Sequence, residues 1–164
     1  MATKTRDKPA APARTRYEDD LYTWVQEQVA LLRAGRLGEV DAENVAEELG
    51  DVGKSEYRSL SSSIAVLVQH LLKWDHQPSR RTRSCALSVR EQRIEIELVL
   101  AESPGLKSRI GEAVEQGYRL ACVRALKETG LDENTFPAAC PYSFDEMMTM
   151  PVLLEPKTRK RRKR

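Results

Sequence analysis

The sequence predicts an all-α fold, a compact bundle of four main helices with one or two short ones. From Tyr17 onward, apolar residues recur at spacings of three and four, with little of the two-residue alternation that is typical of strands. The chain has 164 residues and three cysteines without a CxxC pair. A chain of this length can bury a sufficient core without disulfides or metal.

The two ends of the chain differ in charge from the rest. Residues 1–16 carry five basic residues and one acidic residue, and residues 156–164 carry seven basic residues. This leaves 15 basic and 24 acidic residues in residues 17–155, a net charge of −9. Because like charges repel and these ends offer little apolar surface to bury, we expect disordered basic tails on one helical domain, residues 17–155.

The first two predicted helices are short. The first begins near Asp19 or Asp20, whose acidic side chains suit a helix N-terminus, and it ends at Gly35. Asp41 then caps an acidic helix, "AENVAEELGDV". Two glycines, Gly50 and Gly53, follow, and each costs about 1 kcal/mol inside a helix, so we expect a break or a bend there.

The next helix carries the clearest apolar pattern of the chain. Ser55 is its expected cap, and Pro78 ends it because proline disfavours a helical conformation in the residue before it. Its apolar residues step by four and three, as in a tightly packed bundle. We therefore expect a central helix whose seam consists of Leu60, Ile64, Leu67, Leu71 and Trp74.

Three further helices complete the prediction. One runs from about Ser84 to Glu102, with Leu87, Ile94 and Leu98 along one side and Val89, Ile96 and Leu100 beside them. The next opens at Ser103-Pro104, reaches about Glu128 and is closed by Gly130. Small residues at four-residue intervals predict the close approach of another helix to this one; they are Ala113, Gly117, Ala121 and Ala125. A capping box of Ser143 and Glu146 begins the last, short helix.

Several long stretches carry a resemblance to a known family. These are "YEDDLYTWVQEQVALLRAGRLGEVDAENVAEELGDVGKSE", "HLLKWDHQPSRRTRS", "REQRIEIE" and "ETGLDENTFPAACPYSFDEM". They resemble the bacterial domain-of-unknown-function 29 family over roughly Tyr17 to Pro151. The resemblance implies an all-helical bacterial protein of the cytoplasm, and it implies no reaction, cofactor or catalytic residue. One departure is that this chain has Cys85 where family members carry tryptophan after "RS".

The segment "HLLKWDHQPSRRTRS" and the start of the next helix form the strongest local cluster of charge. The candidate residues are His70, Lys73, Arg80, Arg81, Arg83, Arg90 and Arg93, with Glu47 and Glu48 of the acidic helix as their candidate partners. In one interpretation the arginines pair with the acidic helix and fix how two helices dock. In the other they form an anion site with Lys73 and the helix N-terminus near Ser84. We favour the first, because acidic partners are abundant within the domain.

The sequence gives little indication of a metal-binding site. His70 and His76 are six residues apart, whereas a helix brings together residues three or four apart. Asp75 and Cys85 add suitable ligand types without a known zinc spacing. We expect no metal and no cofactor.

There is no GxSxG motif and no glycine-rich phosphate loop, and we expect Cys85 to be a packed, inert thiol. No catalytic residue is predicted, and whether the chain is an enzyme stays open.

Two functional hypotheses of different class follow. The first is a non-enzymatic cytoplasmic interaction protein, whose acidic body contacts a protein partner while its basic tails add weak, nonspecific nucleic-acid affinity. The C-terminal residues that would make this contact are Lys157, Arg159, Lys160, Arg161, Arg162, Lys163 and Arg164. The alternative is an enzyme or small-anion binder with a site around His70, Lys73, Arg80, Arg81 and Glu47. No apolar run approaches the length of a membrane span, so no membrane contact is expected.

Overall fold

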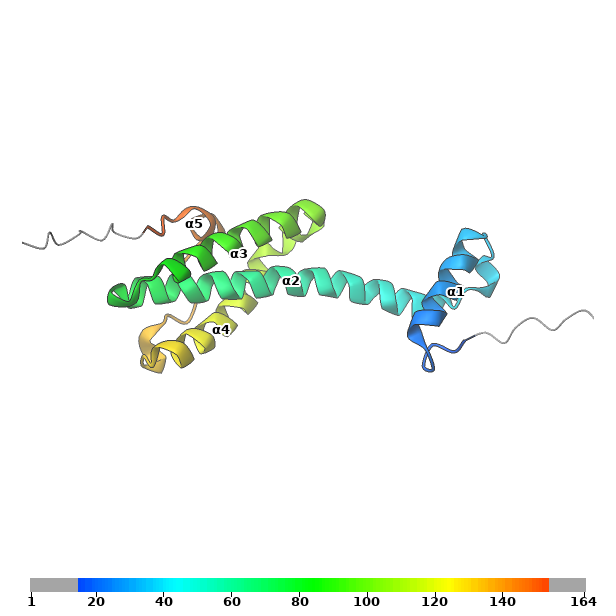
Figure 1. The fold of residues 1–164 in the computed structure, drawn as a ribbon, viewed down its shortest axis with the longest axis horizontal. Helices are drawn as coiled ribbons and strands as arrows, with labels where there is room; N and C mark the ends of the chain where they lie inside the picture. The colour runs from blue at the N-terminus through cyan, green and yellow to red at the C-terminus, as the bar shows by residue number, and fades with distance from the viewer. Residues whose placement is uncertain (1–14, 154–164) are drawn as a thin grey trace, which may run out of the picture. The chain divides into compact units, whose positions relative to one another are not determined.

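The computed structural model describes residues 15–153, and it confirms the predicted all-α class, with no strand in that range. Figure 1 shows the helices of the chain. The chain divides into two compact units between Val52 and Gly53, and each unit is described by itself. The two predicted basic tails lie outside the described residues, apart from Thr15 and Arg16 at the end of the first.

The first unit is built around helix α1 (Leu21–Arg33). As predicted, an aspartate begins it: the Asp20 carboxylate accepts a hydrogen bond from the Thr23 amide at 3.0 Å. The helix ends at Arg33 with Ala34 as its cap, and Gly35 follows with a positive φ of 70°, which glycine adopts without strain. A 3-10 turn, η1 (Leu37–Glu39), then leads to the start of the next helix. The inward face of α1 buries Trp24, Gln28 and Leu31.

Helix α2 runs without interruption over Ala42–His76, so of the break or bend predicted at Gly50 and Gly53 the break is wrong. Each glycine costs about 1 kcal/mol, but a break would also leave the backbone groups around it without helical hydrogen bonds. The strong helix formers on both sides of the glycines keep the helix intact. The division between the two units nevertheless falls at Gly53, the second of these glycines. The end of α2 before Pro78 is confirmed.

In the second unit, the rest of α2 packs with α3 (Arg83–Glu102), α4 (Ile110–Thr129) and the short α5 (Phe144–Thr149). Three 3-10 turns link these helices: η2 (Pro78–Arg80), η3 (Pro104–Arg109) and η4 (Glu133–Thr135). Figure 1 shows α3 and α4 on either side of α2. The predicted central seam is confirmed, since Leu60, Ile64, Leu67, Leu71 and Trp74 are all buried.

The small-residue stripe of α4 also acts as predicted. Its four residues, Ala113, Gly117, Ala121 and Ala125, are all buried. At Gly117 the two helices are so close that an added β-carbon would lie 3.0 Å from the backbone oxygen of Ser61 on α2. Helix α4 begins later than the predicted start at Ser103-Pro104. The first residues of the predicted helix form the 3-10 turn η3, in which the Leu106 amide bonds to the Ser103 carbonyl, and the α-helix begins at Ile110.

Candidate functional site

Two of the predicted site residues, His70 and Lys73, lie in a polar cluster between α2, α3 and α4. The Sγ atom of Cys85 on α3 lies 3.4 Å from Nδ1 of His70 and 3.7 Å from the His70 carbonyl oxygen. Thr82 holds the thiol in this place, because its hydroxyl caps α3 by accepting from the Cys85 amide at 3.2 Å. The side chain predicted to be an inert thiol is thus buried against one of the two histidines.

A carboxylate on α4 completes the cluster. Lys73 donates to Oε2 of Glu128, and the Gln69 amide donates to Oε1 of the same side chain at 2.7 Å. Gln69 and Lys73 are one helical turn apart on α2, so the Glu128 carboxylate can accept hydrogen bonds from both side chains. Sequence reasoning missed Glu128, because nothing in its local pattern separates it from the other glutamates of the chain.

The electrostatics of the cluster favour neutral groups at its centre. Burial lowers the pKa of His70, and the nearby Lys73 charge acts in the same direction. Burial also raises the pKa of the Cys85 thiol. By contrast, the hydrogen bond from Lys73 lowers the pKa of Glu128, so that its carboxylate stays charged. The Cys85–His70 contact therefore joins a thiol to a neutral imidazole, without the thiolate character that nucleophilic cysteines need.

Two of the predicted arginines bind backbone oxygens at helix ends. Arg81 donates to the carbonyl oxygen of Trp74 at 2.9 Å and its guanidinium lies 5.1 Å from the centre of the Trp74 ring. Arg93 donates to the carbonyl oxygens of Met147 and Met150, both at 2.7 Å. The two bonds of Arg93 tie α3 to the C-terminal end of α5. For both arginines the sequence had suggested carboxylates as partners, whereas the structure shows backbone oxygens.

The other three predicted arginines, Arg80, Arg83 and Arg90, are exposed. Within residues 15–153 none of them makes a hydrogen bond or an ion pair. Their pairing with Glu47 and Glu48 stays a prediction. In the first unit, Glu48 accepts a hydrogen bond from the Tyr17 hydroxyl at 2.6 Å, and this bond is the main reason that the pKa of Tyr17 rises to about 12.

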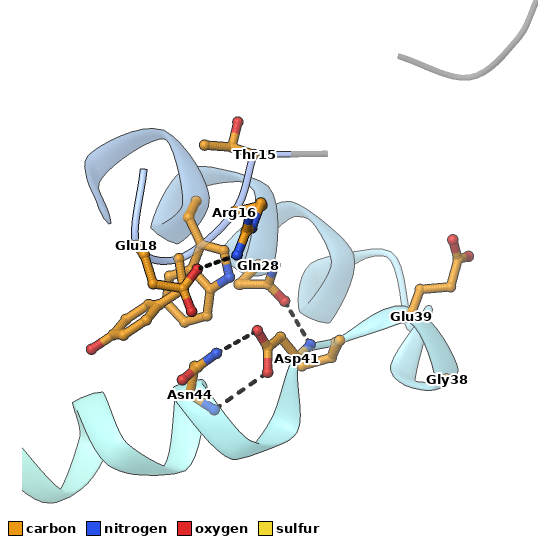
Figure 2. A pocket seen from close by; sticks show the side chains of 11 residues that line it. Thr15, Arg16, Glu18, Gln28, Gly38, Glu39, Asp41 and Asn44 are labelled. Carbon is orange, nitrogen blue, oxygen red and sulfur yellow. Dashed lines mark hydrogen bonds and ion pairs between the residues drawn. The ribbon is translucent and has the colours of Figure 1, made fainter. Parts of the chain in front are cut away.

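The first unit contains a hollow of about 440 Å³ that the sequence did not suggest (Figure 2). Polar side chains from the start of the described chain, from α1 and from the start of α2 line it. They include Arg16, Glu18, Gln28, Asp41 and Asn44, with Tyr17 and Trp24 supplying aromatic surface. The signal that could have found it is the turn "GRLGEVD", because a tight connection between two helices leaves backbone groups that polar side chains must satisfy.

Most polar atoms of this hollow already serve the fold. Figure 2 shows the Gln28 side-chain oxygen accepting from the Asp41 amide, at 2.9 Å. The Asp41 carboxylate accepts from the backbone amide of Asn44 at 3.3 Å and from its side-chain amide at 2.7 Å. These bonds lower the pKa of Asp41. The polar groups of the hollow therefore connect α1 to the N-terminus of α2. Arg16 and Glu18 form an ion pair at 3.7 Å on its rim.

Neither a metal site nor a membrane span emerges from the described chain. No group of three or more His, Cys, Asp or Glu side chains among residues 15–153 could hold a metal ion. His76, the second histidine, packs edge-on against the ring of Phe136, with 5.1 Å between the ring centres. Among the helices of residues 15–153, none is both long and apolar enough to cross a bilayer.

Comparison with known proteins gives one match. A family described as "Domain of unknown function DUF29" matches residues 16–152. No curated protein and no solved structure matches the chain.

Proposed function

Starting from the fact that this chain belongs to the domain-of-unknown-function 29 family, we propose that it is a non-enzymatic interaction protein of the bacterial cytoplasm. Its acidic helical body contacts a protein partner, and its basic ends add weak, nonspecific affinity for nucleic acid. The family membership itself implies no reaction, so the proposal rests on the surface of the molecule and on the distribution of its charge.

The observation that carries the protein-binding part is the exposure of large apolar side chains on regular helices of the second unit. These are Leu87, Ile94 and Leu98 on α3 and Leu120 and Val123 on α4. Apolar groups that share a face mark interaction surfaces more often than single exposed ones do. The polar cluster at His70, in contrast, uses its hydrogen-bonding groups on one another.

The nucleic-acid part is supported by the charge distribution alone. Seven of the last eight residues are basic, while residues 17–155 carry a net charge of −9. A basic segment attached to an acidic body attracts phosphate backbones without reading their sequence, and it does so less strongly as salt rises.

A salt titration tests this part. We expect the full chain to bind nonspecific duplex DNA with an affinity that falls as salt rises, by a slope of about −0.9 per phosphate contact. A full-length variant with the seven basic residues of 157–164 changed to glutamine should bind more weakly and with a shallower slope. Equal affinity of the two proteins, or affinity that does not depend on salt, would contradict the proposal.

The alternative function is a small-anion site around His70, Lys73, Arg80, Arg81 and Glu47. Its only support is that Arg80, Arg83 and Arg90 are unpaired within residues 15–153. It predicts that inorganic phosphate raises the midpoint of thermal unfolding and that R80Q abolishes this effect. Under the interaction hypothesis, phosphate changes the two midpoints equally.

A further inference from the structure

Helix α3 has two apolar faces, and only one of them is covered. Val89, Ile96 and Val99 point into the core of the second unit. Leu87, Ile94 and Leu98 remain 52%, 48% and 51% exposed. With about 100° of rotation per residue, the two sets point in nearly opposite directions. The second face is therefore not an edge of the core but a separate apolar surface.

The outer face has the spacing of a helix-pairing seam. From Leu87 the seam passes through Glu91, Ile94, Leu98 and Ala101, in alternating steps of four and three. This is the repeat with which two helices pack along each other, and it extends here over about 21 Å of helix. Single exposed leucines need no explanation, whereas three at this spacing describe a surface that another helix fits.

The charges along α3 run against the preference of an isolated helix. Its first turn holds no acidic residue and its last turn no basic one. Arg83 and Arg90 lie in the N-terminal half, while Glu95 and Glu97 lie in the C-terminal half. The helix dipole favours the opposite order. In the described part of the chain none of these four side chains has a hydrogen bond or an ion pair, so no contact within residues 15–153 accounts for them.

We propose that the chain forms a two-fold symmetric dimer, in which the outer face of α3 packs antiparallel against the same face of a second copy. This inference rests on the proposed function, because it names the protein partner of the helical body. The charge order is the reason for choosing a second copy. Under a two-fold axis, the basic half of each α3 meets the acidic half of the other, and both helix dipoles are also opposed.

The spacing sets the register of the two helices. When Leu87 packs against the partner's Leu98, Arg90 comes beside the partner's Glu97, and symmetry makes each contact twice. A parallel arrangement would instead align the two helix dipoles, which repel each other. The same antiparallel register places Glu91 opposite the partner's Ile94, where its carboxylate must turn toward solvent. This one mismatch weakens the seam, so E91L is expected to tighten the dimer.

Sedimentation of the full chain over a range of concentrations tests the dimer. We expect a reversible dimer whose dissociation constant increases about tenfold or more in I94E, since the charge would be buried in the seam. The matched control is L49E, which places the same charge on an exposed apolar position of α2, 68% exposed in the structure. It should leave the dissociation constant unchanged, and far-UV circular dichroism should show that both variants keep their helices.

A charge exchange tests the partner and the register together. R90E and E97R should each weaken the dimer, and R90E/E97R should restore it, because in a symmetric pair the double variant rebuilds both contacts. A monomeric full chain at every concentration overturns the inference. So does a dimer that I94E leaves intact, or one that both single changes weaken and the double variant does not restore.

The outcome is separable from that of the DNA titration. A monomer that binds DNA in a salt-dependent manner keeps the nucleic-acid part of the proposed function and loses the dimer. A dimer that does not bind DNA keeps the α3 interface and loses the nucleic-acid part.

Discussion

Gly117 of α4 lies against the backbone of Ser61 on α2 with no room for a β-carbon. Such an atom would come within 3.0 Å of the Ser61 carbonyl oxygen and 3.1 Å of the Ala65 amide nitrogen. Both neighbours are backbone atoms of a buried helix, so they can move only if the helix moves. The approach of α4 to the central helix, and with it the packing of the core, depends on this glycine.

Replacing this glycine should therefore destabilise the protein. We expect G117A to lower the free energy of unfolding by about 1–3 kcal/mol, because the gain in helix propensity is smaller than the strain of an overpacked contact. The measurement is urea unfolding followed by circular dichroism. The control is G111A in the same helix, where an added β-carbon meets nothing within 4 Å. It should be neutral or stabilising by up to about 1 kcal/mol, and equal effects of the two changes would contradict the packing argument.

The buried His70 should make stability depend on pH. Burial lowers its pKa in the folded protein, so the unfolded chain binds the proton more readily. The contribution is fully present above the unfolded value of about 6.5 and is lost as pH falls below it. We expect the unfolding free energy of the wild type to fall between pH 7.5 and about 5.5, and H70Q to fall less over the same range.

This pH range also separates His70 from its neighbour Glu128. The lowered pKa of Glu128 contributes stability that is present above the ordinary value of 4.5 and is lost as pH falls through the lower folded value. That loss therefore occurs at more acidic pH. Parallel curves for the wild type and H70Q above pH 5 would show that His70 does not titrate with unfolding.

The ion pair of Lys73 and Glu128 should contribute more than an ordinary surface pair. Its side chains are 24% and 48% exposed, and Gln69 binds the same carboxylate. A double-mutant cycle with K73M and E128Q should give a coupling of about 1 kcal/mol. The matched pair on α4 is Arg119 and Glu115, 76% and 72% exposed, for which we expect roughly 0.3–0.5 kcal/mol. Equal couplings would mean that the partial burial of the first pair has no effect.

Arg93 should hold the C-terminal end of α5 in place. Its guanidinium binds the carbonyl oxygens of Met147 and Met150, which the end of a six-residue helix leaves without helical partners. In R93Q we expect faster amide hydrogen exchange over residues 144–152, with a smaller change elsewhere. R80Q, which removes an exposed arginine from the same predicted cluster, is the control. Unchanged exchange in R93Q would contradict the anchoring role.

Particular residues show how far local patterns reach in this protein. The seam from Leu60 to Trp74 and the stripe from Ala113 to Ala125 were predictable. Buried positions repeat with the 3.6-residue period of the helix, so apolar or small residues recur at spacings of three and four in the sequence. The predicted break at Gly50 and Gly53 was wrong, because propensity is a small term beside the hydrogen bonds of a continuous helix.

The candidate site was less predictable than the fold. His70 and Lys73 were selected because rare and charged residues crowd around them, but their partners come from far along the chain. Glu128 is 55 residues from Lys73, and Cys85 is 15 residues from His70. The partners of the arginines were unpredictable for the same reason. A carboxylate and a backbone oxygen are both good acceptors for a guanidinium, and Arg93 binds backbone oxygens because the end of α5 lies beside it.

By itself the sequence determined that this protein is helical, where most of its helices begin and end, and which faces of α2 and α4 are buried, since each of these follows from residues within a few positions of one another. Only the tertiary structure decided which apolar face of α3 enters the core. Leu87, Ile94 and Leu98 are as hydrophobic as Val89, Ile96 and Val99, so the pattern of the helix is the same on both sides. The surface that packs is the one that faces α2 and α5, while Leu87, Ile94 and Leu98 stay about half exposed.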